Sequence, residues 1–489
     1  MHQTPSEPED LLSTPAAGPA AVRGGATRVA GFFVSSVLSV FAAAILFRHL
    51  GGVGVGRYVT IFSLVAIVGG ISDLGLTQLG IRELSITPVA GRGALARDLL
   101  GLRIALSVVG LAGTLVFALV AYSWTIFVGV AIAGVGLILQ AAQDNYGAML
   151  QVDLRFGWVA ALDVLRQLAT AALVVGLVLL DAHLLALVSV YVWAGLLVLV
   201  IAGLLVRGQR SLLPAFDLRR SARLLRLVAP FSAAMIAATL YPQEAVVLVG
   251  LISNQHQLGE YAASFRVIQG LTAVPALVVG AALPIFARAA RDDRARFDYA
   301  IGRVFEVAVV VGGAAAVGVA VGAPLAIEII GGAGFRDAAG VLAIQSVALG
   351  ASFVGSLWGN GLLSQGRYRE LVALNTAGAV LLAGVLAVLV SLDGARGAAI
   401  AVSLLELGMA VAGGLLLCRG GRVGRPGLGV VAKVALAGAV GLLPGLWTGA
   451  PDAARLVLAV GLYGAVILLT RALPAEVDGL LPARLRAVR

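Results

Sequence analysis

The sequence predicts an all-α polytopic membrane protein with about 14 transmembrane helices, and three observations lead to this fold class. First, 60% of the 489 residues are hydrophobic, only 12% are charged, and the mean hydropathy is +1.01. Second, the apolar residues fall into runs that are long enough to cross a bilayer. Third, the arginines collect in alternate connections between these runs. A soluble enzyme is excluded, since ordinary soluble domains carry roughly 25% charged residues.

The predicted spanning helices form two sets of six and a final pair. The first six cover residues 27–47, 58–81, 99–121, 124–143, 158–180 and 183–206. The next six cover residues 227–251, 261–286, 301–330, 338–363, 371–391 and 397–418, and the last two cover residues 428–447 and 454–472. The 301–330 segment contains several glycines and Pro324, so we expect it to tilt, kink or break.

The distribution of basic residues sets the expected orientation. With the N-terminus inside, 29 of the 35 basic residues fall in cytoplasmic segments. The outer side then holds only Arg48, Arg57, Arg336, Arg396 and Arg455, and Arg266, within the eighth helix, is the one basic residue assigned to neither side. Because cytoplasmic loops are enriched in Arg and Lys, we expect a protein of the cytoplasmic (inner) membrane with both termini in the cytoplasm. The net charge of +10 reflects this orientation, and no nucleic acid partner is expected.

The expected organisation has five parts. They are a disordered cytoplasmic tail (1–25), an N-terminal six-helix lobe (26–206), a basic cytoplasmic linker (207–226), a C-terminal six-helix lobe (227–420), and two additional helices with a basic tail (421–489).

Two sequence echoes suggest that the lobes are parallel copies of one unit. Gly56-Arg57-Tyr58 follows the first helix, and Gly259-Glu260-Tyr261 follows the seventh, 203 residues later. Leu154-Arg155-Phe156 precedes the fifth helix, and Gly366-Arg367-Tyr368 precedes the eleventh, at a spacing of 212 residues. Both spacings approximate the length of six helices, as in carriers whose halves are related by an axis along the membrane normal. Chance similarity in a glycine-rich sequence is the alternative.

The sequence indicates no catalytic chemistry, no cofactor and no metal site. Lys433 is the only lysine and lies outside any Gly-Lys-Ser/Thr phosphate loop. The four histidines are too far apart in the chain for a zinc site at helical spacing. The glycines in residues 51–56 follow a membrane helix rather than a strand, which predicts a tight periplasmic turn instead of a nucleotide-binding loop.

Polar side chains at membrane depth are the candidate site, because a charge in lipid is costly without a cavity or a partner. Arg266 lies about one turn into the eighth helix, and Gln269 lies one turn further on the same face. Arg266 is either a cation that binds an anion in a central cavity or an arginine that extends to the outer head groups. On the seventh helix, Tyr241 and Glu244 are candidate cavity residues, and Glu244 either pairs with Arg266 or carries a proton.

Other charged residues have two interpretations each. Arg48 and Arg57 flank the first outer turn and mark either the same anion pathway or an interfacial anchor. Asp73 lies toward the inner end of the second helix, where we expect a cap or a pair with Arg82 rather than ion coupling. Glu406 is the most deeply placed of the remaining isolated carboxylates and is a further candidate for coupling.

Two blocks of the sequence resemble a known family. The first runs from Phe47-Arg48-His49-Leu50-Gly51 through Gly56-Arg57-Tyr58 to Ser72-Asp73-Leu74-Gly75-Leu76 and Ile81-Arg82-Glu83-Leu84. The second comprises Pro230, Tyr241-Pro242-Gln243-Glu244, Leu258-Gly259-Glu260-Tyr261-Ala262-Ala263 and Pro284-Ile285-Phe286-Ala287-Arg288. Over residues 26–420 the chain resembles the O-antigen type polysaccharide flippases of the multidrug/oligosaccharidyl-lipid/polysaccharide (MOP) exporter superfamily. It departs at Glu244, where we expect an aspartate in many members.

The resemblance implies a flippase that moves a polyprenyl-diphosphate-linked oligosaccharide, a precursor of cell-surface polysaccharide, across the lipid bilayer by alternating access. With such a substrate, the anion that we expect Arg266 to bind is the diphosphate. H+ or Na+ and a glycan polymerase or glycosyltransferases are candidate partners. Lipid II flippases and drug/cation antiporters of the same superfamily are alternatives, although the two additional C-terminal helices disfavour the twelve-helix antiporter plan. A membrane glycan polymerase or ligase is the alternative of another class. Such enzymes place a large loop outside, whereas each predicted outer loop has about ten residues or fewer.

Overall fold

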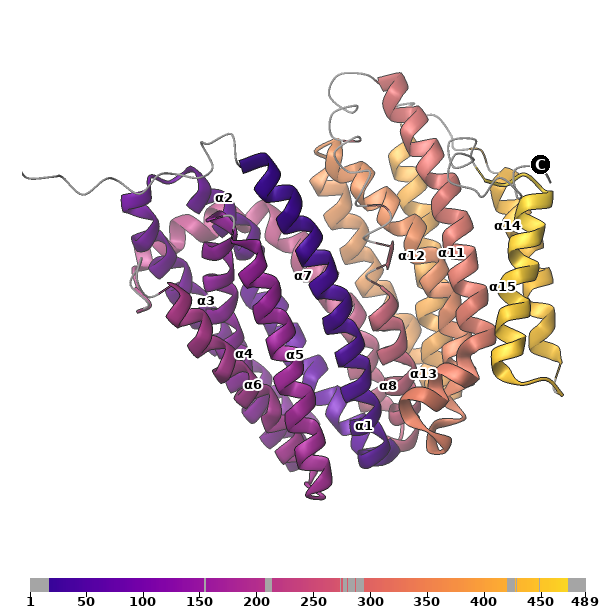
Figure 1. Cartoon of the computed structure of the whole chain (residues 1–489), viewed down its shortest axis with the longest axis horizontal. Coiled ribbons are helices and arrows are strands. Elements are labelled where there is room, and N and C mark those ends of the chain that lie inside the picture. Colours follow the sequence, from indigo (N-terminus) through magenta and orange to yellow (C-terminus); the bar gives the residue numbers. More distant parts are fainter. Residues whose placement is uncertain are drawn as a thin grey trace, which may run out of the picture. The chain divides into compact units, whose positions relative to one another are not determined.

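The computed structural model describes residues 17–153, 155–206, 213–272, 274–275, 279, 286, 294–419, 427, 429–447 and 449–473. Within these residues the regular secondary structure is entirely helical, with no strand (Figure 1). Ten helices are long and apolar enough to span a membrane in the part of the chain described. The chain is a multi-pass membrane protein.

Each predicted spanning segment overlaps a helix of the structure. The first half contains α1 (Ala17–Asp73), α2 (Leu76–Ile86), α3 (Val89–Ala121), α4 (Trp124–Val152), α5 (Phe156–Leu179) and α6 (Leu184–Val206). The rest contains α7 (Leu218–Ile252), α8 (Gln255–Leu271), α11 (Arg294–Gly331), α12 (Ala338–Ser364), α13 (Tyr368–Cys418), α14 (Gly429–Leu442) and α15 (Asp452–Leu469), with short 3-10 turns at Ala333–Phe335 and Leu443–Leu446. Of the tail predicted at 1–25, residues 1–16 lie outside the described residues, and residues 17–25 already belong to α1.

Two of the helices each contain a pair of predicted spans separated by a sharp break. Helix α1 breaks at Gly51, whose φ of 64° is tolerated because glycine has no Cβ atom. Helix α13 breaks at Asp393 and Gly394, where Gly394 has a φ of 50°. The turns expected between these spans are therefore only one or two residues long.

The segment predicted as one helix over residues 58–81 is instead divided. Leu74 and Gly75 have φ values of 47° and 81°, so α1 ends at Asp73 and α2 begins at Leu76. Left-handed backbone cannot continue a right-handed helix, and this is why the single helix ends there. By contrast, α11 stays helical from Arg294 to Gly331 and includes Pro324, so the break considered for residues 301–330 does not occur.

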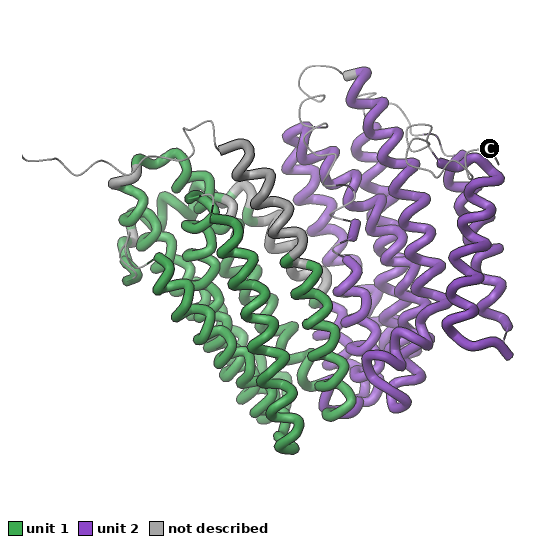
Figure 2. The backbone as a smooth tube through the Cα atoms, viewed as in Figure 1, with its two compact units in different colours: residues 1–50, 57–243 green, residues 51–56, 244–489 purple. Residues whose placement is uncertain are grey.

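The chain divides into two compact units (Figure 2). Unit 1 comprises residues 1–50 and 57–243, and unit 2 comprises residues 51–56 and 244–489. In unit 1, the apolar core includes the fully buried Leu76, Leu99 and Met149. In unit 2, Phe305 stacks on Trp358 within a core that α14 and α15 complete by packing on α11.

Candidate functional site

Arg266 and Gln269 lie on one face of α8, as their spacing indicates. Asn254 caps this helix, since its side-chain oxygen accepts a hydrogen bond from the backbone N–H of Gln257 at 2.9 Å. The half-buried Arg266 donates from Nη1 to Oε1 of the exposed Gln269 at 2.8 Å. This contact engages one of the five N–H groups of a guanidinium, a group suited to bidentate binding of phosphate.

Of the two candidates on the seventh helix, only the side chain of Glu244 lies within the described residues. Glu244 lies on α7 and is half-buried, and among the described residues it forms no ion pair with Arg266. The side chain of Tyr241 lies outside the described residues. Glu406 is half-buried on α13.

Residues 52–56 of α1, directly after the break at Gly51, pack against the start of α8, the helix that carries Arg266. A Cβ atom on Gly259 would lie 2.3 Å from the carbonyl oxygen of Gly52, so only glycine permits this approach. Gly56 in turn lies against the side chain of Leu258. Arg48 and Arg57 flank these residues on α1; the side chain of Arg48 is exposed and that of Arg57 is half-buried.

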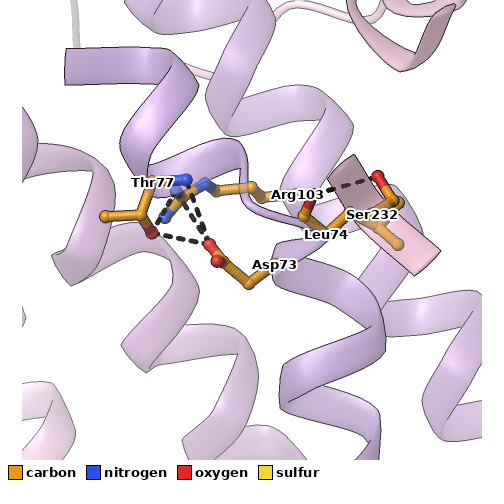
Figure 3. A network of polar contacts seen from close by, with 5 residues as sticks. All are labelled: Asp73, Leu74, Thr77, Arg103 and Ser232. Atoms are coloured by element: carbon orange, nitrogen blue, oxygen red, sulfur yellow. Dashed lines mark hydrogen bonds and ion pairs between the residues drawn. The ribbon is translucent and has the colours of Figure 1, made fainter. Parts of the chain in front are cut away.

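Asp73 forms an ion pair with Arg103 of α3 and not with the expected Arg82 (Figure 3). Its Oδ1 accepts hydrogen bonds from Arg103 Nη2 at 3.1 Å, from Thr77 Oγ1 at 2.6 Å and from the backbone N–H of Thr77 at 3.2 Å. Arg103 Nη2 also donates to Thr77 Oγ1 at 2.7 Å. Asp73 therefore caps a backbone N–H in the first turn of α2, although the N-cap position itself is Gly75. Arg82 lies further along α2, beyond the break after Asp73.

A further hydrogen bond holds the break itself in place. Ser232 of α7 donates from Oγ to the carbonyl oxygen of Leu74 at 3.0 Å (Figure 3). The carbonyl of the left-handed Leu74 is thereby held by a side chain of α7. The side chain of Arg103 is only 4% exposed, so its end of this polar network is buried within unit 1.

The sequence analysis did not single out Asp144, a residue of unit 1. Asp144 of α4 lies within the electrostatic influence of Arg103, Arg166, Asp73 and Asp163, which come from three other helices. The Nε atoms of Arg103 and Arg166 are buried and have no hydrogen-bond partner in the described part of the chain. The available signal was that Asp144 is the only charged residue of α4.

The described residues contain no candidate metal site. No group of three or more His, Cys, Asp or Glu side chains there is arranged to hold a metal ion.

The comparisons with known proteins agree on one family and one fold. The sequence matches the family of polysaccharide biosynthesis proteins over residues 45–340. No curated protein matches it significantly. Among solved structures, the lipid II flippase MurJ in an inward closed conformation is similar with a TM-score of 0.75 and 11% identity, over 91% of this chain and 98% of that chain.

Multidrug transporters of the MATE family share the fold less closely. An inward-facing member of the MOP superfamily has a TM-score of 0.54 and 17% identity, over 78% of this chain and 93% of that chain. An outward-facing structure has a TM-score of 0.56 and 16% identity, over 81% of this chain and 94% of that chain. At these identities the structural similarity shows a shared fold only. Together with the family match, this shared fold confirms the resemblance to the MOP superfamily that the sequence suggested.

Proposed function

The chain belongs to the polysaccharide biosynthesis protein family, and on this premise we propose that it is a flippase. Its substrate is a polyprenyl-diphosphate-linked oligosaccharide, which it moves from the inner to the outer leaflet of the cytoplasmic membrane by alternating access. The family match carries this proposal. The fold shared with a lipid II flippase over most of both chains supports it, because that protein also moves a lipid-linked substrate.

Arg266 is the proposed contact for the diphosphate. A guanidinium at membrane depth is costly unless an anion or water compensates it, and a diphosphate offers several oxygens for bidentate hydrogen bonds. The hydrogen bond to Gln269 orients the guanidinium, which carries its donors in a fixed planar fork. Arg48 and Arg57, on either side of residues 51–56 in the sequence, are proposed as further anion contacts, and Tyr241 as a further substrate contact.

Glu244 is the proposed coupling residue, with H+ or Na+ as the ion. It is half-buried and forms no ion pair with Arg266 in the described structure, whereas Asp73 is engaged with Arg103 and serves a structural role. Glu406 is the second candidate. An inside-negative potential of about 100 mV favours outward movement of two negative charges by up to about 4.6 kcal/mol. Ion coupling therefore serves to reset the empty carrier more than to drive the lipid outward.

Matching turns support the proposal that the two halves are copies. Arg155 and Arg367 each precede a helix with nearly the same backbone, φ −87° and ψ 47° against φ −83° and ψ 51°. Each donates its backbone N–H to the carbonyl five residues earlier, at 2.8 Å and 2.9 Å. Each guanidinium also reaches a carbonyl 50 residues further on, that of Leu205 or of Leu417. We propose that these turns are equivalent points of two lobes, 26–206 and 227–420, joined by the linker 207–226.

The decisive test compares flipping of a fluorescent diphosphate lipid in proteoliposomes at equal protein density. We expect Arg266→Ala to lower the rate tenfold or more, about 1.4 kcal/mol, and Arg266→Lys to restore little, because lysine keeps the charge but loses the planar fork. Arg336→Ala removes an exposed arginine elsewhere in unit 2 and is the matched control, with a rate near that of the wild type. A wild-type rate for Arg266→Ala would reduce this residue to an interfacial anchor.

Two further measurements separate the alternatives. Deletion in cells should leave a complete oligosaccharide-lipid in the inner leaflet without affecting its synthesis; elongation or transfer of glycans by the purified protein would instead indicate a polymerase or ligase. Competition by lipid II, or by organic cations, in the flipping assay would reassign the substrate to that of the corresponding superfamily members.

A further inference from the structure

The linker before α7 is fixed on the N-terminal part of α3 by hydrogen bonds to its backbone. Ala215 donates its N–H to the carbonyl of Arg97 at 3.0 Å, and Arg97 Nε donates to the carbonyl of Leu213 at 3.2 Å. Gly101 allows this approach, because a Cβ atom there would lie 1.9 Å from the carbonyl oxygen of Ala215. The linker from Leu213 onward therefore has a defined position on unit 1.

One face of the first turns of α7 continues this attachment. Arg220 Nη1 donates to Oδ2 of Asp98 on α3 at 2.9 Å, and the side chain of Asp98 is only 7% exposed. The hydrogen bond and charge of Asp98 raise the pKa of Arg220. Leu224, one turn after Arg220, is buried in the core of unit 1. Asp217 caps the helix by accepting from the backbone N–H of Arg219 at 2.9 Å.

The other face of α7 carries a basic stripe, which we define as Arg219, Arg223 and Arg226. Their spacing of four and then three residues places them on one side of the helix, and all three are exposed. Two apolar side chains of the linker, Leu213 at 70% and Phe216 at 68% exposure, precede the stripe. The backbone from Leu213 through the first turns of α7 is attached to α3. These exposed basic and apolar side chains therefore stand on a fixed backbone rather than on a free loop.

We propose that the basic stripe, with Leu213 and Phe216, is a docking surface for anionic phospholipid head groups of the leaflet beside the linker. The linker directly follows the membrane-spanning α6, so the stripe lies within reach of the head groups. Three guanidinium groups on one face complement their negative charge, and an apolar pair beside such a face is typical of segments that lie in the interface. An acidic soluble protein would match the charge but not explain the exposed Leu213 and Phe216.

Native mass spectrometry of the full chain, purified from nanodiscs of mixed phosphatidylcholine and phosphatidylglycerol, tests the proposal. The readout is the number of phosphatidylglycerol molecules retained relative to phosphatidylcholine. Each arginine near an anionic surface contributes about a fivefold gain in affinity, so the triple change Arg219→Gln, Arg223→Gln and Arg226→Gln should lower the preference at least about tenfold. The corresponding triple lysine variant should keep most of it, because the attraction depends on charge more than on bidentate geometry.

The matched control removes three exposed arginines elsewhere, through Arg82→Gln, Arg369→Gln and Arg419→Gln. We expect this variant to retain phosphatidylglycerol like the wild type. An equal loss in both glutamine variants would mean that only net charge matters and would overturn the proposal. An unchanged phosphatidylglycerol preference in the stripe variant would also overturn it and assign the stripe to another partner, such as an acidic protein.

Discussion

Arg367 joins the start and the end of α13, and its replacement by alanine should be among the most destabilising single changes in unit 2. Its side chain is 8% exposed. Nη2 donates to the carbonyl of Leu416 at 2.7 Å, and Nη1 donates to that of Leu417 at 3.3 Å. Nε donates to Oε1 of Glu370 at 2.8 Å, and Nη2 donates to the other oxygen of the same carboxylate. These contacts require the two segments of α13 to fold back on each other at the break before Ala395.

The free-energy cost of Arg367→Ala follows from what it leaves behind. The change removes the charge that compensates Glu370 and strips two carbonyls at the end of α13 of a donor. Because Glu370 is 37% exposed, the ion pair itself contributes about 1 kcal/mol or less, and the two lost hydrogen bonds from the charged donor to carbonyls contribute about 1.5–3 kcal/mol each, so we expect a loss of about 4 kcal/mol. Arg155 is the matched control, because it precedes a helix with nearly the same backbone geometry, whereas within the described residues its side chain makes one long hydrogen bond, 3.5 Å from Nη1 to the carbonyl of Leu205. Arg155→Ala should cost about 1 kcal/mol or less.

Thermal unfolding in detergent, followed by size-exclusion chromatography, distinguishes these values. For units of this size about 1 kcal/mol corresponds to a Tm change of about 2–4 °C, so Arg367→Ala should lower the Tm by about 10 °C and Arg155→Ala by about 3 °C. Arg367→Lys should fall between them, since lysine keeps the ion pair but cannot reach two carbonyls and a carboxylate together. Equal shifts for both alanine variants would refute the energetic reasoning from hydrogen bonds.

Two other predictions concern packing and orientation. Gly259→Val should lower folded yield severalfold because its side chain would collide with the carbonyl oxygen of Gly52, whereas Gly270→Val, with no heavy atom within 4 Å of its Cβ position, should leave the yield unchanged. Similar yields for both would contradict the close approach of residues 52–56 to α8. In a Cys418→Ser background, Leu213→Cys should react with an impermeant maleimide only after cells are opened, since the linker is expected in the cytoplasm; labelling of intact cells would invert the topology.

The spanning helices could be predicted because a bilayer demands long apolar runs, and these runs are visible in the sequence. The breaks were harder to locate. The chain turns at Gly51 and at Asp393–Gly394 with one or two residues out of helical geometry, and it bends at Leu74, a residue type that gives no warning of a positive φ. The carbonyl of Leu74 accepts a hydrogen bond from Ser232 of α7, which is 158 residues away in the sequence, so no local pattern could indicate this contact.

Ion pairs within one helix could be predicted from the sequence, whereas ion pairs between helices could not. Pairs three residues apart on one helix, such as Arg303 with Glu306 at 2.8 Å, follow from helical spacing alone. Asp73 also had a partner nearby in sequence, Arg82, but it pairs with Arg103, and Asp98 pairs with Arg220 across 122 residues. In both cases a buried or partly buried aspartate meets an arginine from another helix, so the choice of partner depends on how the helices pack. The sequence therefore shows which residues are charged. Which of these residues form ion pairs depends on the break at Leu74, next to Asp73, and on the attachment of the linker, next to Arg220.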